Sequence, residues 1–352
     1  MSALNAEPVG GPQAWYGPDV AGNAADWTYE LSAKDISEIR SAVRTAQAAE
    51  LDIAALRKEH FPLDTFADRL ARLRRDLLSG RGFCLVRGLP VETLSREEAA
   101  VAFWGIGTHL GLAVSQNGKG HVLGHVKDLG LDYADPNNRG YQTSARLPYH
   151  TDYADIVGLL CLRTAREGGL SSIVSSVTVY NEMLGARPDL VEVLREPLFR
   201  TRWGEVGSDR PPWVEVPAFN LHENGVVTTY VRSAVRKAQL MPEVPRISAQ
   251  QNEAMDYFDS LAESSRLHLD MSFERGDMQF LNNHWVLHSR TSYVDHDEPA
   301  EKRHLLRLWL ACNDGPPFPP AMTESFQGLT ANGRPNGIHV PGVAFNAPLE
   351  AE

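Results

Sequence analysis

Cysteine and long apolar segments are both scarce in this chain. Its 352 residues include three cysteines. Cys84, Cys161 and Cys312 lie far apart in apolar stretches, so we expect buried reduced thiols rather than a disulfide framework or a zinc site. The longest apolar run, residues 156–162, is too short to cross a membrane. No basic segment followed by an apolar one stands at the N-terminus, so we expect no signal peptide and a cytoplasmic location.

An excess of basic residues is also missing. The chain has 34 lysines and arginines against 45 aspartates and glutamates, a formal net charge of −11. This balance disfavours nucleic acid and anionic membrane surfaces as partners. Hydrophobic residues make up 43% of the chain and charged residues 22%. Both values are typical of globular proteins and exclude a disordered or coiled-coil chain.

Several catalytic motifs are absent as well. The chain has no G-x-x-x-x-G-K-[ST] phosphate loop, no C-x-x-C pair and no G-x-S-x-G turn. His284 and His288 have the spacing of a zinc peptidase, but Trp285 occupies the position of the required glutamate. A P-loop enzyme, a serine hydrolase and a zinc peptidase are therefore unsupported.

The apolar pattern predicts helices first and short strands later. Helices are expected from a cap at Asp35 to about 49, over 64–78, from a capping box at Ser95 to about 110, over 179–194 with a break at Pro188, and over 249–261. Strands are expected at 83–86, 122–126, 156–162, 172–177, 226–231, 278–281, 284–288 and 304–311. Many short strands with helices outside them indicate a mainly β fold with helices (α+β), a sandwich or jelly roll.

No change of composition marks a second independent domain, so we expect a single structural unit. Residues 1–80 are predicted to form an N-terminal extension and helices that pack on the core. Residues 81–352 are predicted to form the core itself, with a helical insert at about 178–265 and an irregular tail after Asp314.

The most informative short pattern is His150-Thr-Asp152. In an extended segment, residues i and i+2 face the same way, so this imidazole and carboxylate can reach one metal ion. A histidine from a distant strand would complete the facial triad of non-haem Fe(II) oxygenases. The tripeptide alone is a weak signal, because it also fits a hydrogen-bonded surface pair and because a second copy occurs at His268-Leu-Asp270.

The surrounding motifs strengthen the assignment of His150. Gly168-Gly169 and Ser171 follow it, and His288 lies in a later candidate strand. Arg303 and Arg307 then lie within an apolar strand. A buried arginine needs an anionic partner, and its planar fork suits a carboxylate; an ion pair within the protein would satisfy it equally.

Together, residues from about 83 to 310 resemble the taurine dioxygenase (TauD/TfdA) family of Fe(II)/2-oxoglutarate-dependent oxygenases. The resemblance implies a double-stranded β-helix, or cupin-like jelly roll, with external helices. It implies that Fe(II) is bound by His150, Asp152 and His288. It further implies that the co-substrate 2-oxoglutarate is bound by Arg303, Ser171 and Arg307, and that O2 is the oxidant. The presence of Asp152 argues against the halogenating variants of this pattern.

The resemblance also implies a reaction. A C–H bond of a small, carboxylate- or amino-acid-like substrate would be hydroxylated, desaturated, cyclised or cleaved, with release of succinate and CO2. Substrate contacts are expected among Gln116, Asn117, Tyr149, Tyr153, Asp155 and Arg307. Two alternatives remain open: an oxygenase that acts on a protein, and a cupin-like protein that binds metal and 2-oxoglutarate without turnover. A homo-oligomer, dimer or tetramer, is compatible with the sequence.

Overall fold

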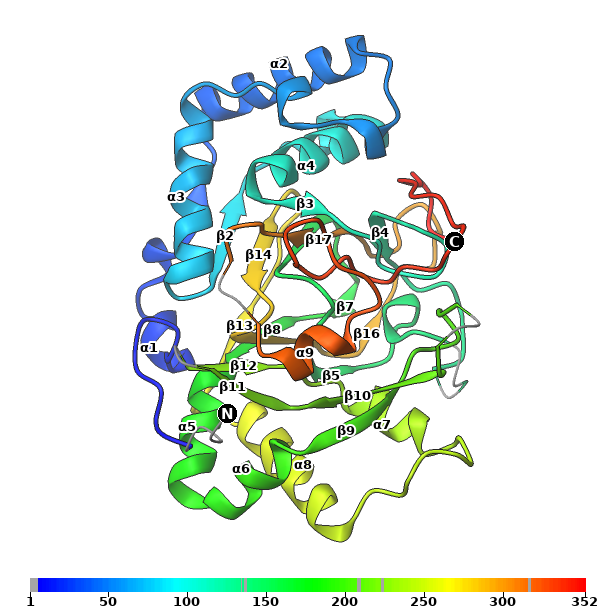
Figure 1. Cartoon of the computed structure of the whole chain (residues 1–352). Helices are drawn as coiled ribbons and strands as arrows, with labels where there is room; N and C mark the ends of the chain where they lie inside the picture. The colour runs from blue at the N-terminus through cyan, green and yellow to red at the C-terminus, as the bar shows by residue number, and fades with distance from the viewer. Residues whose placement is uncertain (1–5, 134, 136–137, 208–209, 223–224, 316–317) are drawn as a thin grey trace.

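Two β-sheets face each other in the computed structural model, which describes residues 6–133, 135, 138–207, 210–222, 225–315 and 318–352 (Figure 1). The larger, seven-stranded sheet has the order β1 (Thr28–Glu30), β2 (Phe83–Arg87), β14 (Met278–Asn282), β6 (Ile156–Arg163), β17 (His304–Ala311) and β3 (Leu112–Ala113), and β4 (Leu123–Val126) also pairs with β17. The smaller sheet has the order β13 (His268–Met271), β8 (Ser171–Ser175), β15 (Val286–Arg290) and β5 (Leu147–His150). The expected jelly roll with external helices is thereby confirmed.

The inner faces of the two sheets form the core between them. Its buried residues include Phe83, Leu85, Val157, Ile173, Leu269, Leu281, Val286 and Trp309. Trp15 and Trp27 pack on Phe83, with ring centroids 4.9 Å and 5.6 Å from it. The beginning of the chain therefore closes one end of the sandwich rather than forming a separate layer.

A first helical layer covers the outer face of the larger sheet. It contains α2 (Ala33–Ala48), α3 (Thr65–Ser79) and α4 (Arg96–Leu110), and its apolar side chains pack on outward residues such as Leu306 and Leu308 of β17. The capping box at Ser95 is confirmed. For α2, the expected cap is wrong: Ser32 is the N-cap, and Asp35 is the third helical residue of a capping box.

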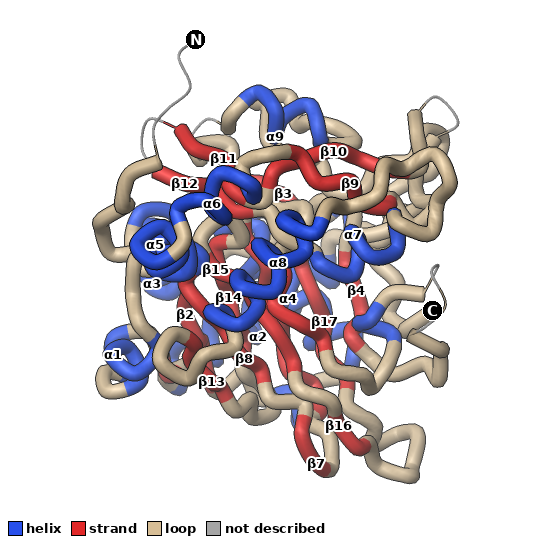
Figure 2. Tube along the Cα trace, turned by 90° about the horizontal axis from the view of Figure 1, so that it is seen from below, coloured by secondary structure: helices blue, strands red, loops and turns tan. Residues whose placement is uncertain are grey.

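A second helical layer covers the outer face of the smaller sheet (Figure 2). It contains α5 (Ser176–Ala186), α6 (Pro188–Leu194), α7 (Arg232–Ala238) and α8 (Ala249–Ala262). The expected break at Pro188 is confirmed, because this proline begins α6. The predicted strand 172–177 is too long, since the Ser175 side chain caps α5 and ends the strand there.

The predicted insert is less helical than expected. Two antiparallel hairpins lie within it, β9 (Pro197–Thr201) with β10 (Trp213–Pro217) and β11 (Phe219–His222) with β12 (Gly225–Thr228). The remaining elements are short: α1 (Gly17–Ala21), β7 (Glu167–Gly168), β16 (Tyr293–Val294), α9 (Pro320–Ser325) and the 3-10 turns Ala24–Asp26, Ile53–Ala55, Lys58–His60, Val91–Thr93 and Gly140–Gln142.

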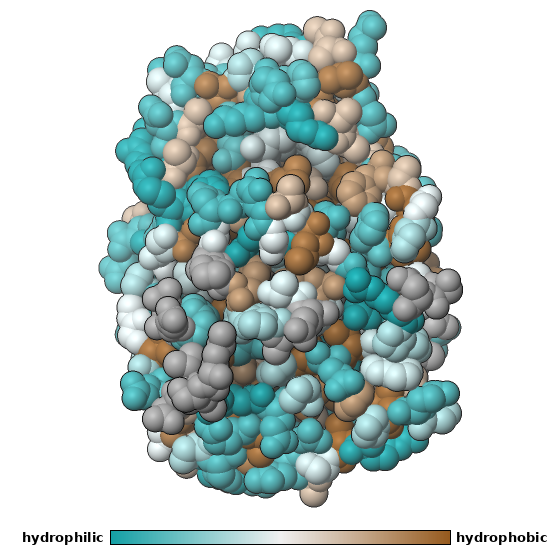
Figure 3. Space-filling view, viewed as in Figure 1, coloured by the Kyte–Doolittle hydropathy of each residue, from teal (hydrophilic) through white to brown (hydrophobic). Residues whose placement is uncertain are grey.

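The N-terminal segment and the surface complete the description. Strand β1 pairs in parallel with β2, so residues before 81 contribute an edge strand to the larger sheet. All three cysteines are buried and free, as expected. No described helix combines the length and hydrophobicity that crossing a bilayer requires. The face drawn in Figure 3 is mainly hydrophilic, with hydrophobic residues in small separate groups.

Candidate functional site

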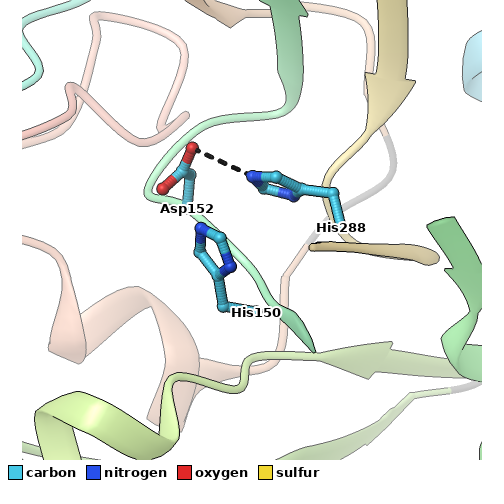
Figure 4. Close-up of side chains that lie close together, drawn as sticks. All are labelled: His150, Asp152 and His288. Carbon is cyan, nitrogen blue, oxygen red and sulfur yellow. Dashed lines mark ion pairs between the residues drawn. The ribbon is translucent and has the colours of Figure 1, made fainter. Parts of the chain in front are cut away.

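His150, Asp152 and His288 converge on one point inside the sandwich (Figure 4). Strands β5 and β15 are antiparallel neighbours, and their register places His288 directly opposite His150. The two imidazole centroids are 4.2 Å apart. Asp152 follows the end of β5, and its Oδ2 lies 3.6 Å from Nε2 of His288. One ligand atom from each residue lies within 4.8 Å of the others.

Hydrogen bonding and burial hold both histidines ready to bind a cation. Nδ1 of His150 lies 2.9 Å from the Pro148 carbonyl oxygen, which can only accept, so this nitrogen carries the proton and Nε2 keeps its lone pair. Burial, with smaller contributions from His150 and Arg307, lowers the pKa of His288 to about 3. His288 is therefore neutral, as a metal ligand must be.

The position of Asp152 is determined by contacts on both sides. Its amide donates to Oδ1 of Asn283, and Nδ2 of Asn283 donates to its carbonyl, at 2.7 Å and 2.6 Å. The Trp309 indole donates to Oδ2 of Asp152 at 2.8 Å, and Nη1 of Arg307 lies 3.7 Å from the same oxygen. Burial raises the pKa of Asp152, but Arg307, the two histidines and the indole outweigh it and lower the pKa below its usual value. The carboxylate is thus ionised.

These three residues fit a divalent iron ion. Two imidazoles and one carboxylate on one side of a cation leave the other positions open, which is the donor set of non-haem Fe(II) oxygenases. Within the described part of the chain, this is the one cluster of three histidine, cysteine or acidic side chains close enough to share an ion. His284 is not part of it, because its Nε2 lies 2.8 Å from Oδ1 of Asp155.

A cavity beside the two histidines contains buried, incompletely paired arginines. Ser171, Arg290, Arg303 and Arg307 line it together with His150 and His288. Nη1 of Arg303, and both Nε and Nη1 of Arg290, are buried and have no hydrogen-bond partner in the described part of the chain. Both guanidiniums lie over the Tyr293 ring, 5.1 Å and 4.7 Å from its centroid. Burial lowers the pKa of both arginines, to about 10 for Arg290. A bound carboxylate would satisfy these donors.

Glycine makes room for this cluster. Gly169 has a φ of +69°, and a Cβ there would lie 3.0 Å from Nε of Arg303. A larger residue at Gly169 would therefore be strained and would press on Arg303, whereas one at Gly168 would clash with the Ser292 carbonyl.

Strand alternation explains why Arg307 and Trp309 of β17 lie on the same side of the sheet. Residues two apart on a strand share a face, and the intervening Leu306, Leu308 and Leu310 pack outward on the helices. Arg307 is aligned by Gln116, whose Oε1 accepts from Nε of Arg307 at 2.7 Å and whose Nε2 donates to the Arg307 carbonyl at 2.8 Å.

A second cavity lies in front of the triad. Tyr149, Tyr153, Arg307 and Trp309 line it, as do His150 and Asp152. The structure thus brings three of the expected substrate contacts to this cavity. It does not bring Gln116, Asn117 or Asp155 there, which corrects our expectation.

Each of these three polar side chains is engaged elsewhere. Gln116 is 1% exposed, and its Oε1 accepts the hydrogen bond from Arg307. Asn117 accepts from two backbone amides of its own turn. Asp155, also 1% exposed, is ion-paired with Arg334 and hydrogen-bonded to His284. Their placement shows that nearness in sequence to a ligand does not put a side chain in the cavity.

Sequence reasoning missed three residues at the site. Asn283 and Trp309 bind Asp152, and Arg290 lines the cavity beside the two histidines. A usable signal existed for two of them: Arg290 is two residues after His288, and Trp309 two after Arg307, so each shares a strand face with a recognised residue. The bond from Asn283 to the Asp152 backbone had no such signal.

Comparison with known proteins agrees with this geometry. Residues 45–309 match the family model described as taurine catabolism dioxygenase TauD, TfdA family. The chain belongs to this family. FR-33289 synthase of Streptomyces rubellomurinus is 31% identical to it over 95% of this chain and 99% of that protein. A taurine hydroxylase-like protein of Stachybotrys chartarum is 30% identical over 84% of this chain and 77% of that protein.

Solved structures share the fold of this TauD/TfdA-family chain. An asparagine oxygenase in complex with Fe(II), 3-hydroxyasparagine and succinate aligns with a TM-score of 0.63, at 17% identity over 81% of this chain and 93% of that one. The family membership and the two-histidine, one-carboxylate cluster identify an Fe(II)/2-oxoglutarate-dependent dioxygenase that uses O2.

Proposed function

We propose that His150, Asp152 and His288 bind the iron, and that Arg303, with Ser171 and Arg290, binds the distal carboxylate of 2-oxoglutarate. The observation that carries this proposal is the cavity in which incompletely paired guanidiniums lie next to the two histidines. A dicarboxylate that reaches the metal with one end would satisfy these donors with the other.

Iron(II), 2-oxoglutarate and O2 together supply the oxidation of a substrate C–H bond, with release of succinate and CO2. The protein residues orient the participants. Asn283 and Trp309 hold Asp152 in place, and Pro148 selects the tautomer of His150. The aromatic and aliphatic residues around the cluster limit the access of water.

We infer that the substrate is a small anionic molecule, carboxylate- or amino-acid-like. Arg307 supports this inference, because it lines both cavities and so lies between 2-oxoglutarate and the proposed substrate space. The net charge of −11 and the mainly hydrophilic face in Figure 3 also favour a small molecule over nucleic acid or a membrane surface. The asparagine oxygenase with the same fold is a precedent for an amino-acid substrate.

An anaerobic absorbance titration tests the assignment. Metal-free protein receives Fe(II) and then 2-oxoglutarate, and a visible charge-transfer band is expected. His150→Ala should abolish the band, and Arg303→Met should require much more 2-oxoglutarate to produce it. Arg266→Met is the matched control, because Arg266 is an exposed arginine that pairs with Glu182 outside these cavities. Absence of the band in folded, iron-loaded wild-type protein would overturn the assignment.

A binding protein without turnover is the second candidate. It would give the same band but no succinate with any candidate substrate under O2. Perturbation of the band by added compounds provides the screen, because a substrate bound in front of the triad changes the metal environment. Succinate formation that depends on a compound selected in this way excludes the second candidate.

A further inference from the structure

Arg200 is a buried arginine that has no acidic partner among the described residues. It lies on β9 opposite Val214 of β10 and is 1% exposed. Its Nη2 donates to the carbonyl and the hydroxyl of Thr229, and its Nε has no partner. No carboxylate among the described residues lies within ion-pairing distance of this guanidinium, and burial lowers its pKa.

The buried arginines differ in this respect: among the described residues Arg202 and Arg290, like Arg200, have no ion pair, whereas others have one. Arg232 pairs with both Asp256 and Asp259, and Arg334 pairs with Asp155. A desolvated guanidinium that lacks an anion is costly, and an anionic ligand would offset that cost. Arg303, which we assign to 2-oxoglutarate, is in the same condition.

Arg200 lines a small separate cavity beside the space in front of the triad. The two cavities share Thr151, Asp152, Tyr153 and Val231 in their walls. The far wall of the Arg200 cavity comes from α9 and the segment after it, through Met322 and Pro335. Tyr153 therefore belongs to the walls of both the substrate space and a smaller compartment that contains the Arg200 guanidinium.

We propose that Arg200 binds an oxyanionic group of the substrate in this compartment, at a point separate from Arg307. This inference rests on the proposed function, because it assumes that the cavity in front of the triad holds the substrate. A carboxylate, a sulfonate and a phosphonate share the required chemistry, namely oxygen acceptors that match the arginine fork. The substrate would thus be held by its acidic end while a carbon atom near Asp152 is oxidised.

The test measures anion binding to the protein loaded with Fe(II) and 2-oxoglutarate under anaerobic conditions. Acetate, methanesulfonate and methylphosphonate serve as probes and are titrated against the charge-transfer band and the tryptophan fluorescence. Wild-type protein should bind at least one probe, and Arg200→Met should weaken that binding about ten-fold or more. Arg200→Lys, which keeps the charge but not the fork, should lie between them. The order of the three probes identifies the kind of oxyanion.

Stability distinguishes a ligand-binding arginine from a structural one. Because Arg200 has no acidic partner to leave unpaired, Arg200→Met should leave the Tm of the ligand-free protein unchanged or raise it. Arg232→Met, by contrast, should lower the Tm, since it leaves Asp259 without its cation. Arg266→Met controls for the loss of one positive charge.

Three results would contradict the proposal. Equal probe affinity in wild type and Arg200→Met would do so, as would probe binding that increasing 2-oxoglutarate displaces, since the probe would then occupy the Arg303 site. A large loss of Tm in Arg200→Met and Arg200→Lys alike would show a structural role. If wild-type protein gives no charge-transfer band, the proposed function itself fails; if the band is normal and Arg200 does not affect probe binding, only this inference fails.

Discussion

Two His-x-Asp tripeptides occupy the two outer strands of the same four-stranded sheet, β5 and β13. His150 on β5 lies opposite His288, whereas His268 on β13 lies opposite Val174. Val174 packs outward with the helices α5, α6 and α8, while the next residues along β13 and β8, Leu269 and Ile173, face the interior. The two tripeptides therefore project from opposite faces of one sheet.

Burial and partners follow from this difference. The side chain of Asp152 is 10% exposed and accepts a hydrogen bond from the Trp309 indole. The side chain of Asp270 is 50% exposed, and its Oδ1 lies 3.7 Å from Nε2 of His268. A shift of one residue in strand register reverses the face of every side chain. The tripeptide thus becomes a metal site only where the register turns it inward toward a third ligand.

The largest difference between the two tripeptides should appear when the histidine of each is replaced in turn. We expect His150→Ala to lose the Fe(II)/2-oxoglutarate band and to reduce succinate formation to background, because two ligands do not hold the ion. His268→Ala should keep both properties close to the wild-type level. Iron content after gel filtration and succinate release measure the effect. Equal losses in both variants would refute the distinction between the two faces.

Much of this arrangement was predictable from the sequence, because it is local or periodic. The strand that carries Arg307 and Trp309 follows from an apolar run, and the capping box at Ser95 begins α4 where expected. The pairing of β5 with β15 was not derivable from either strand alone, since it joins segments far apart in the chain. The resemblance to a family supplied His288 where spacing could not.

Two of the three wrong substrate contacts have a common physical cause. Asp155 and Gln116 were expected in the substrate cavity because of their position in the chain, but each satisfies a buried arginine instead. A short polar side chain turns toward the nearest buried charge, and that charge comes from a distant segment, Arg334 or Arg307. Single-sequence patterns contain no information on such a partner.

The next largest effect should come from removing the positive charge of Arg303, which lines the cavity beside His150. Arg303→Met should raise the 2-oxoglutarate concentration required for half-maximal rate by about 30- to 1,000-fold, corresponding to roughly 2–4 kcal/mol for a desolvated charge pair. No equivalent loss is expected for Arg146→Met, since Arg146 is a half-exposed arginine that pairs with Glu263. Steady-state kinetics at saturating iron provide the measurement. A change confined to the maximal rate would show that Arg303 does not contact 2-oxoglutarate.

A smaller effect should follow from removing the indole donor to Asp152. Trp309→Phe keeps the ring but loses the 2.8 Å hydrogen bond to Oδ2. We expect iron to bind about 10- to 100-fold more weakly, as is usual when a residue that orients a metal ligand is changed. Competition with a chelator of known affinity measures this loss. Trp285→Phe is the control, and an equal loss there would show general loosening of the fold.

The smallest expected effect is a difference in 2-oxoglutarate binding between variants of two neighbouring serines of β8. Ser171 lies opposite Arg290 on the inner face and lines the cavity of Arg303, whereas Ser172 lies opposite Asp270 on the outer face and bonds the Tyr149 hydroxyl. Ser171→Ala should raise the half-saturating 2-oxoglutarate concentration by about 2- to 12-fold, corresponding to one hydrogen bond of roughly 0.5–1.5 kcal/mol. Ser172→Ala should leave that concentration unchanged and lower only the Tm. If Ser172→Ala affects 2-oxoglutarate as strongly as Ser171→Ala, the face of the sheet does not decide which serine meets the co-substrate.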